Sequence, residues 1–276
     1  MADFTTKQLQ VNGLDFNVLD EGDGAPVLLL HGFPDSWRLW RHQVPALLDA
    51  GFRVIAPDQR GFGESAKPQE VEAYSADKLL GDLLGILDQL GVPKTHVVGH
   101  DWGGAMAWTI AGLVPDRVDR LVAMSVPHPQ TLFSSVRQYA LSWYMLMFQY
   151  PFAEEVLMRD DWKLMREWGG NAKDIDVYIK DLSRPGALTA GLNWYRAGAR
   201  PEALFRVGDA FVFPSVKADT LGIWSSGDAY LLEDGFLETE KHIEGSWRYE
   251  RIDEASHWMQ LDQPQAVNRL LVDFLT

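Results

Sequence analysis

The segment Gly99-His100-Asp101-Trp102-Gly103-Gly104 constrains the fold of this 276-residue chain more than any other part of the sequence. It follows a β-branched apolar run at residues 95–98 and precedes residues 105–111, whose composition predicts a helix. Glycine on both sides of Asp101 permits a sharp turn, because glycine adopts backbone conformations that are closed to other residues. A strand, a Gly-x-Asp-x-Gly turn and a helix in this order predict an elbow that presents Asp101 over the edge of a sheet.

An aspartate at the tip of such an elbow favours a particular chemistry. Its carboxylate is ionised at neutral pH, since the ordinary pKa of Asp is about 3.9. A serine hydroxyl must lose a proton before it attacks, which suits acyl transfer. A carboxylate suits displacement at a saturated carbon, and the product is an alkyl ester of the protein. The motif therefore favours enzymes that open epoxides or cleave carbon–halogen bonds over esterases and lipases.

The rest of the chain predicts an α/β fold with a mostly parallel sheet flanked by helices. Short apolar runs bounded by Gly and Pro alternate with helical patterns, as in βαβ units. Asn12-Gly13 separates two further strand patterns and predicts an antiparallel hairpin at the edge of the sheet. The expected strands are Val27–Leu30, Arg53–Ala56, Leu121–Met124 and Leu221–Trp224, and the expected helices are Leu79–Leu90, Ala105–Leu113 and Ala266–Phe274.

The alternation fails between about Pro127 and Ser215, where aromatic residues and Met occur at helical spacing without clear strands. An insertion of this size between two strands predicts a helical cap over the strand ends, where open α/β sheets bind ligands. We therefore expect residues 1–127 and 216–276 to form the α/β core and residues 128–215 to form the cap. The alternative is a single compact domain with extra helices.

Composition bears on compartment and partners. The formal net charge of −14 disfavours nucleic acids and anionic membranes, because both repel an acidic surface. The chain has no cysteine, a start without the pattern of a signal peptide, and no apolar run approaching the roughly 20 residues that span a bilayer. These features predict a cytoplasmic protein that binds neither nucleic acid nor membrane.

An ester on Asp101 would need a base that activates water and a carboxylate that orients the base. His257 lies late in the chain, before the expected C-terminal helix, and Asp228 follows the expected strand that ends near Trp224. Both residues should therefore reach the same sheet edge as Asp101. Glu233 and Asp234 compete for the role of Asp228 but lie further from the strand end.

Ester hydrolysis also requires an oxyanion hole. One backbone N–H comes from the residue after the nucleophile, here Trp102, and another from an earlier loop. His31-Gly32-Phe33-Pro34 follows an expected strand and can supply the second N–H from Phe33, because proline has none.

These motifs, together with residues 58–65, residues 125–129 and Ser256-His257-Trp258, resemble the α/β-hydrolase-fold epoxide hydrolases of the aspartate-nucleophile branch. The resemblance runs from His31 to about Pro264. It implies conversion of a hydrophobic epoxide and water to a vicinal diol, without a cofactor or a metal ion.

The resemblance also implies that two cap tyrosines donate hydrogen bonds to the epoxide oxygen. It assigns these roles to Tyr144 and Tyr195, with Tyr139 and Tyr150 as nearby rivals of Tyr144. A phenol stays protonated at neutral pH and can stabilise a developing alkoxide. The alternative is that both tyrosines only pack the cap. The expected substrate-binding residues are apolar and come from the same two segments: Trp143, Met147, Phe148 and Leu192.

Two other functions remain open from the sequence. A haloalkane dehalogenase would share Asp101, His257 and Asp228, but its halide would need N–H donors in place of phenols. A non-catalytic ligand-binding scaffold is disfavoured, because every member of the expected triad is present. The identity of the epoxide and the oligomeric state are not predicted.

Overall fold

The computed structural model describes residues 4–169, 172–205 and 212–276. One eight-stranded sheet runs through the molecule in the order β1-β2-β4-β3-β5-β6-β7-β8. β1 and β2 pair antiparallel, β2 pairs antiparallel with β4, and every later pairing is parallel. The strands are β1 Thr6–Val11, β2 Leu14–Glu21, β3 Pro26–Leu30, β4 Arg53–Pro57, β5 Thr95–His100, β6 Val118–Met124, β7 Asp219–Gly227 and β8 Trp247–Ser256.

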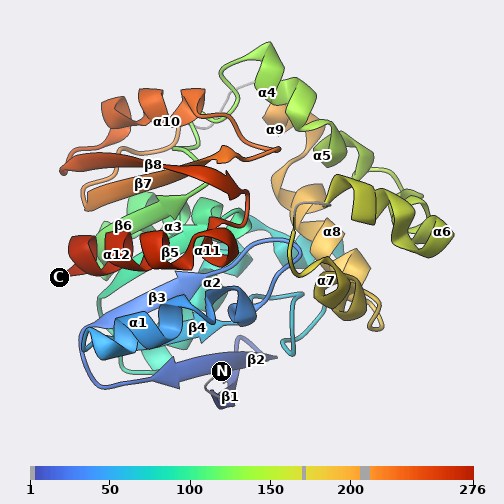
Figure 1. The fold of residues 1–276 in the computed structure, drawn as a ribbon. Coiled ribbons are helices and arrows are strands. Elements are labelled where there is room, and N and C mark those ends of the chain that lie inside the picture. Colours follow the sequence, from blue (N-terminus) through green and yellow to red (C-terminus); the bar gives the residue numbers. More distant parts are fainter. Residues whose placement is uncertain (1–3, 170–171, 206–211) are drawn as a thin grey trace.

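Helices cover both faces of the sheet. In Figure 1, α1, α11 and α12 lie in front of the sheet, and α2 and α3 lie behind it. The central strands are buried on both sides as a result: all six residues of β5 are buried. The helices that accompany the sheet are α1 Gln43–Asp49, α2 Ala76–Gln89, α3 Trp102–Leu113, α10 Asp234–Thr239, α11 Met259–Asp262 and α12 Pro264–Leu275.

Among the described residues between β6 and β7, six helices form a separate group beyond the carboxyl ends of the strands (Figure 1). We refer to α4–α9 as the cap helices. The helix α6 is interrupted at Arg159–Trp162, where three successive residues have positive φ. The cap helices are α4 Val136–Leu141, α5 Trp143–Met147, α6 Ala153–Trp168, α7 Ile175–Leu182, α8 Ala187–Gly198 and α9 Pro201–Leu204.

The predicted α/β fold, the four apolar strands, the three helices and the edge hairpin are confirmed. Asn12 and Gly13 both have positive φ, as a tight hairpin turn requires. The strand β8 was not predicted. It carries many charged side chains because it lies at the edge of the sheet, where most of its residues are exposed or half-buried.

No helix within the described ranges has the length and apolar character needed to cross a bilayer.

Candidate active site

Four groups meet where parallel strands of the sheet end. Asp101 directly follows β5, Asp228 directly follows β7, and His257 directly follows β8. Phe33 lies in the loop after β3. The carboxyl ends of parallel strands share one edge of a sheet, so residues from distant parts of the sequence converge there.

Asp101 occupies a strained turn between β5 and α3. Its φ of 53° and ψ of −125° lie outside the usual regions for an L-residue, at a cost of about 1–3 kcal/mol. The flanking glycines serve close packing: a Cβ on Gly99 would lie 2.1 Å from the carbonyl oxygen of Gly103, and one on Gly103 would lie 2.0 Å from that of Leu30. Tight packing of β5, α3 and β3 thus holds Asp101 in its raised position.

The Asp101 carboxylate is bound by two backbone N–H groups. The Phe33 N–H donates to Oδ1 over 2.8 Å, and the Trp102 N–H also hydrogen-bonds the carboxylate. The loop can approach this closely only with glycine at position 32, because a Cβ there would lie 2.2 Å from Oδ1. Both N–H groups predicted for the oxyanion hole therefore surround the carboxylate.

His257 lies between two carboxylates. Its Nε2 is 3.6 Å from Oδ2 of Asp101, and its Nδ1 is 2.8 Å from Oδ2 of Asp228. The other oxygen of Asp228 accepts hydrogen bonds from the backbone N–H groups of Tyr230 (2.9 Å) and Leu231 (3.0 Å). The rival acid Glu233 instead pairs with Arg251 at 2.9 Å.

His100 fixes the backbone of His257. The two rings lie 4.5 Å apart, and Nε2 of His100 lies 2.9 Å from the His257 carbonyl oxygen. Burial and the neighbouring His257 lower the pKa of His100 to about 3, so this imidazole is neutral and its Nε2–H donates to the carbonyl. The residue before Asp101 thus ties the end of β5 to the end of β8.

The charges in the site depend on one another. Burial alone would raise the pKa of Asp101, but the hydrogen bond and charge of His257 outweigh it and hold the pKa below its ordinary value. Burial alone would lower the pKa of His257, but the Asp228 and Asp101 carboxylates raise it to about 10. At neutral pH the resting site therefore holds an imidazolium between two carboxylates.

Tyr144 on α5 and Tyr195 on α8 are both buried, with ring centroids 5.9 Å apart. Burial and the nearby Asp101 charge raise the pKa of both phenols well above the ordinary value, so both remain protonated. The rivals lie elsewhere: Tyr139 donates its hydroxyl to the Leu204 carbonyl over 3.0 Å, and Tyr150 is 54% exposed.

Two hollows meet at Asp101 and Tyr144. The first, which we call the small hollow, has a volume of about 10 Å³; its walls include Phe33, Met165, Trp168, Ile175, Tyr178, Tyr195, Tyr230, His257 and Trp258. The second, which we call the large hollow, has a volume of about 570 Å³; its walls include Trp102, Leu132, Phe133, Glu202, Leu204, Phe213 and Leu231.

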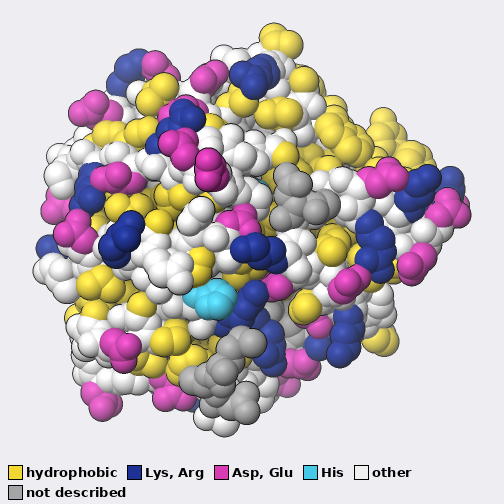
Figure 2. All heavy atoms as spheres, viewed as in Figure 1, with side chains coloured by type: hydrophobic (Ala, Val, Ile, Leu, Met, Phe, Trp, Pro, Cys, Tyr) yellow, Lys and Arg dark blue, Asp and Glu magenta, His cyan; other side chains and the backbone are white. Residues whose placement is uncertain are grey.

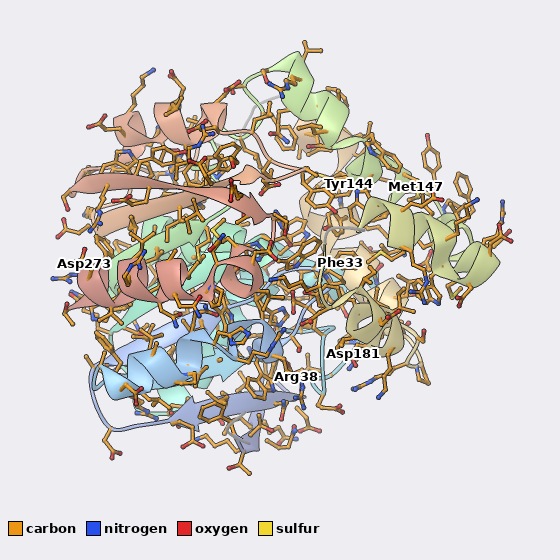
Figure 3. The ribbon with its side chains drawn as sticks, viewed as in Figure 1. Phe33, Arg38, Tyr144, Met147, Asp181 and Asp273 are labelled. Atoms are coloured by element: carbon orange, nitrogen blue, oxygen red, sulfur yellow. The ribbon has the colours of Figure 1, made fainter. Side chains whose placement is uncertain are left out.

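The four predicted substrate-binding residues are not among those that line either hollow. Trp143 is 45% exposed, and Figure 2 shows hydrophobic side chains gathered on the surface where Figure 1 places α5 and α6. Figure 3 places Met147 further out along the cap than Tyr144, which lies with Phe33 at the boundary between sheet and cap. The ring of Phe148 packs against the rings of Phe33 and Tyr195. The side chain of Leu192 is fully buried.

Four aromatic residues of the small hollow were not predicted: Trp168, Tyr178, Tyr230 and Trp258. The ring of Tyr230 lies 5.1 Å from that of His257, and its hydroxyl donates to the Trp168 carbonyl over 2.7 Å. The ring of Trp258 lies 5.1 Å from that of His257 as well. Tyr230 follows Asp228 closely in the sequence, and Trp258 directly follows His257. This proximity to two predicted site residues could have indicated that both aromatic residues belong to the site. No comparable signal marks Trp168.

Within the described part of the chain, no three His, Asp or Glu side chains are grouped so that they could hold a metal ion.

Comparisons with known proteins agree on one family. The family described as alpha/beta hydrolase fold matches residues 25–264. The AB hydrolase superfamily protein YfhM of Bacillus subtilis (strain 168) is 36% identical over 97% of this chain and 96% of its own length. Epoxide hydrolase A of Mycobacterium tuberculosis is 33% identical over 99% of this chain and 97% of its own length.

A solved structure from work on novel epoxide hydrolases of the alpha/beta hydrolase superfamily, found in metagenomes from hot environments, has the same architecture. It superposes with a TM-score of 0.88 at 34% identity, covering 100% of this chain and 99% of its own.

Proposed function

Because this chain belongs to the α/β-hydrolase family and, within it, to the epoxide hydrolases, we propose that it converts a hydrophobic epoxide to a vicinal diol through an ester on Asp101. One observation carries the proposal: the Asp101 carboxylate shares a hollow with two buried, protonated phenols, Tyr144 and Tyr195. A nucleophile opposite a pair of O–H donors is what opening of an epoxide ring requires.

In the first step, Oδ2 of Asp101 attacks a ring carbon while Tyr144 and Tyr195 hold the epoxide oxygen. We assign the attack to Oδ2, because the Phe33 N–H binds Oδ1. The carbon–oxygen bond of the ring breaks, and the leaving oxygen takes a proton from a phenol. The low pKa of Asp101 keeps the nucleophile ionised, and the high pKa of each phenol keeps the donor protonated.

In the second step, His257 removes a proton from water, and the resulting hydroxide attacks Cγ of the Asp101 ester. The ester carbonyl oxygen is Oδ1, to which the Phe33 N–H donates, and the Trp102 N–H also bonds the Asp101 carboxyl group, so the charge of the tetrahedral intermediate develops close to these two N–H groups. The intermediate then expels the diol oxygen, which takes the proton from His257. The new Asp101 carboxyl group gives its remaining proton to His257, which restores the carboxylate and the resting imidazolium.

The first step prepares His257 for its role as a base. An imidazolium cannot accept a proton, and in the resting site two carboxylates keep His257 protonated. Ester formation removes the Asp101 charge and so lowers the pKa of His257. The proton that His257 then loses balances the one that the tyrosine gave to the leaving oxygen. Asp228 remains as the partner that orients the ring.

In this account residues 128–215 act as a cap that supplies the phenols, and residues 1–127 and 216–276 act as the core that supplies Asp101, Asp228 and His257. The shared hollow supports this division, because its walls come from both parts.

The test is diol formation from styrene oxide, measured by chromatography for the wild type, Asp101→Ala and a matched control, Asp116→Ala. Asp116 is exposed on a short helix after α3. We expect turnover in the wild type and the control and none in Asp101→Ala. Halide release from a bromoalkane in place of diol formation would assign the site to carbon–halogen cleavage.

A further inference from the structure

The two hollows that meet at Asp101 differ greatly in size. The small hollow, at about 10 Å³, has room for about one water molecule. The large hollow, at about 570 Å³, is within the range of pockets that bury a small organic ligand. Asp101 and Tyr144 line both hollows.

The small hollow is narrow because its walls are packed against one another. The Trp168 ring lies 4.8 Å from that of Tyr144 and 5.2 Å from that of Tyr230. Tyr178 contributes a second wall, and its hydroxyl donates to the buried Asp35 carboxylate over 2.7 Å. A ring held by several neighbours and a hydrogen bond moves aside only at a cost in packing.

An epoxide bound for the proposed reaction has little freedom of orientation. Its oxygen faces Tyr144 and Tyr195, and the attacked carbon faces Oδ2 of Asp101. The two hollows meet at Asp101 and Tyr144, so substituents on the two ring carbons point away from that place in different directions. A group on one carbon has the large hollow available, whereas a group on the other carbon meets the walls of the small hollow.

We infer that the substrates of this site are terminal epoxides with one uncharged apolar substituent, which lies in the large hollow. This inference rests on the proposed function. The unsubstituted ring carbon lies on the side of the small hollow, whose volume of about 10 Å³ leaves no room for a second substituent.

The lining of the large hollow sets the character of the substituent. Leu132, Phe133, Leu204 and Leu231 present apolar surface. Its described walls include no Lys or Arg, and the two carboxylates among them belong to Asp101 and Glu202. An epoxide whose chain ends in a carboxylate therefore finds no counter-charge there and is repelled by Glu202.

The test compares two substrates that differ by one methyl group on the far ring carbon: styrene oxide and trans-β-methylstyrene oxide. For the wild type we expect kcat/KM for the methylated compound to be lower by roughly 10-fold or more, the effect of forcing a methyl group into packed space. Trp168→Ala should raise the relative kcat/KM of the methylated compound. Ile175→Ala, a milder change in the same wall, should act in the same direction if Trp168→Ala does not fold.

Phe152→Ala is the matched control, because Phe152 is an aromatic residue beside the cap helix α6, is 49% exposed and lies outside both hollows. It should leave the substrate ratio unchanged. A second pair, 1,2-epoxyundecane and 10,11-epoxyundecanoate, tests the charge, and we expect the neutral compound to be preferred.

Equal rates on styrene oxide and its methylated analogue in the wild type would overturn the inference and leave the proposed function intact. An unchanged ratio of kcat/KM between the two compounds in folded Trp168→Ala and Ile175→Ala would also overturn the inference. Failure of the wild type to hydrolyse any of the four epoxides would overturn the proposed function itself.

Discussion

Phe33 donates its backbone N–H to Oδ1 of Asp101 over 2.8 Å, so the N–H that we assign to the oxyanion hole already binds the proposed nucleophile in the resting site. The same contact leaves Oδ2 as the oxygen nearer His257, at 3.6 Å from Nε2. The two oxygens of one carboxylate therefore have different roles before any substrate binds: one is placed to attack, and the other to become the ester carbonyl oxygen.

Replacing His257 by Gln should separate the two steps. Asp101 can still open the epoxide, but no base remains to activate water, so the alkyl ester should accumulate and steady turnover should fall by about 100- to 10,000-fold. Intact-protein mass spectrometry after incubation with styrene oxide should show one added substrate mass. His42→Gln, a change at a half-buried histidine before α1, is the control and should show no adduct. Rapid turnover without an adduct in His257→Gln would contradict the assigned role.

Tyr144→Phe and Tyr195→Phe should each slow ring opening, because each removes one donor to the epoxide oxygen while keeping the ring that packs the cap. Removal of a general acid costs typically 100- to 10,000-fold when no other donor compensates. With one phenol left, we expect a smaller loss in each single variant than in the double variant. Stopped-flow tryptophan fluorescence can follow the alkylation step. Tyr150→Phe, at an exposed tyrosine, should behave as the wild type. If the double variant alkylates Asp101 at the wild-type rate, both tyrosines only pack the cap and the proposed donor role is wrong.

Asp101→Asn should lower the pKa of His257 from its resting value of about 10, because one of the two carboxylates that stabilise the imidazolium is lost. The Asp228 carboxylate remains, so the pKa should stay above that of a buried histidine without a partner. A pH titration of the imidazole nitrogens by NMR measures this change, with Asp116→Asn as the control. An unchanged pKa in Asp101→Asn would show that ester formation does not switch the state of His257.

Asp35 should make stability depend on pH. Burial raises its pKa to about 7 from 3.8, against the hydrogen bond from Tyr178. Asp174 raises this pKa further, whereas the Ser36 N–H and Arg41 lower it. The folded state thus retains a proton that the unfolded chain releases, and this group's contribution to the free energy of unfolding falls as pH rises from about 4 to about 7.

Asp35→Asn removes that pH dependence. The free energy of unfolding of the variant minus that of the wild type should therefore be larger at about pH 8 than at about pH 5. Urea unfolding of both proteins at both pH values measures this difference. A difference between variant and wild type that does not change with pH would mean that the carboxyl group is ionised throughout.

The elbow and its partners could be predicted because their signals are local. Glycine on both sides of Asp101 and the strand and helix patterns around it lie within one short segment. Asp228 and His257 could be placed because each follows a strand or precedes a helix on the same edge of a parallel sheet. The strained φ falls on Asp101 itself, whereas the glycines allow helix α3 to pack closely on strands β5 and β3. Only the three-dimensional packing reveals this division.

The lining of the hollows could not be predicted in the same way. The cap is rich in aromatic residues, and helical spacing does not tell which side of a short helix faces the core. Trp143 precedes Tyr144 on α5, yet one side chain is 45% exposed and the other is 3% exposed. Trp168 reaches the site at the end of a helix that is interrupted at Arg159–Trp162, where a regular helical pattern no longer indicates direction.

A single turnover in water enriched in oxygen-18 tests the central claim most directly, with enzyme in excess over styrene oxide. If Asp101 forms an ester that water attacks at Cγ, the label should enter the Asp101 carboxylate, and mass spectrometry should find it in the peptide that contains Asp101. The diol of that first turnover should be unlabelled. Label in the diol with none in the peptide would mean that water attacks the epoxide directly, and it would contradict the role of Asp101 as nucleophile.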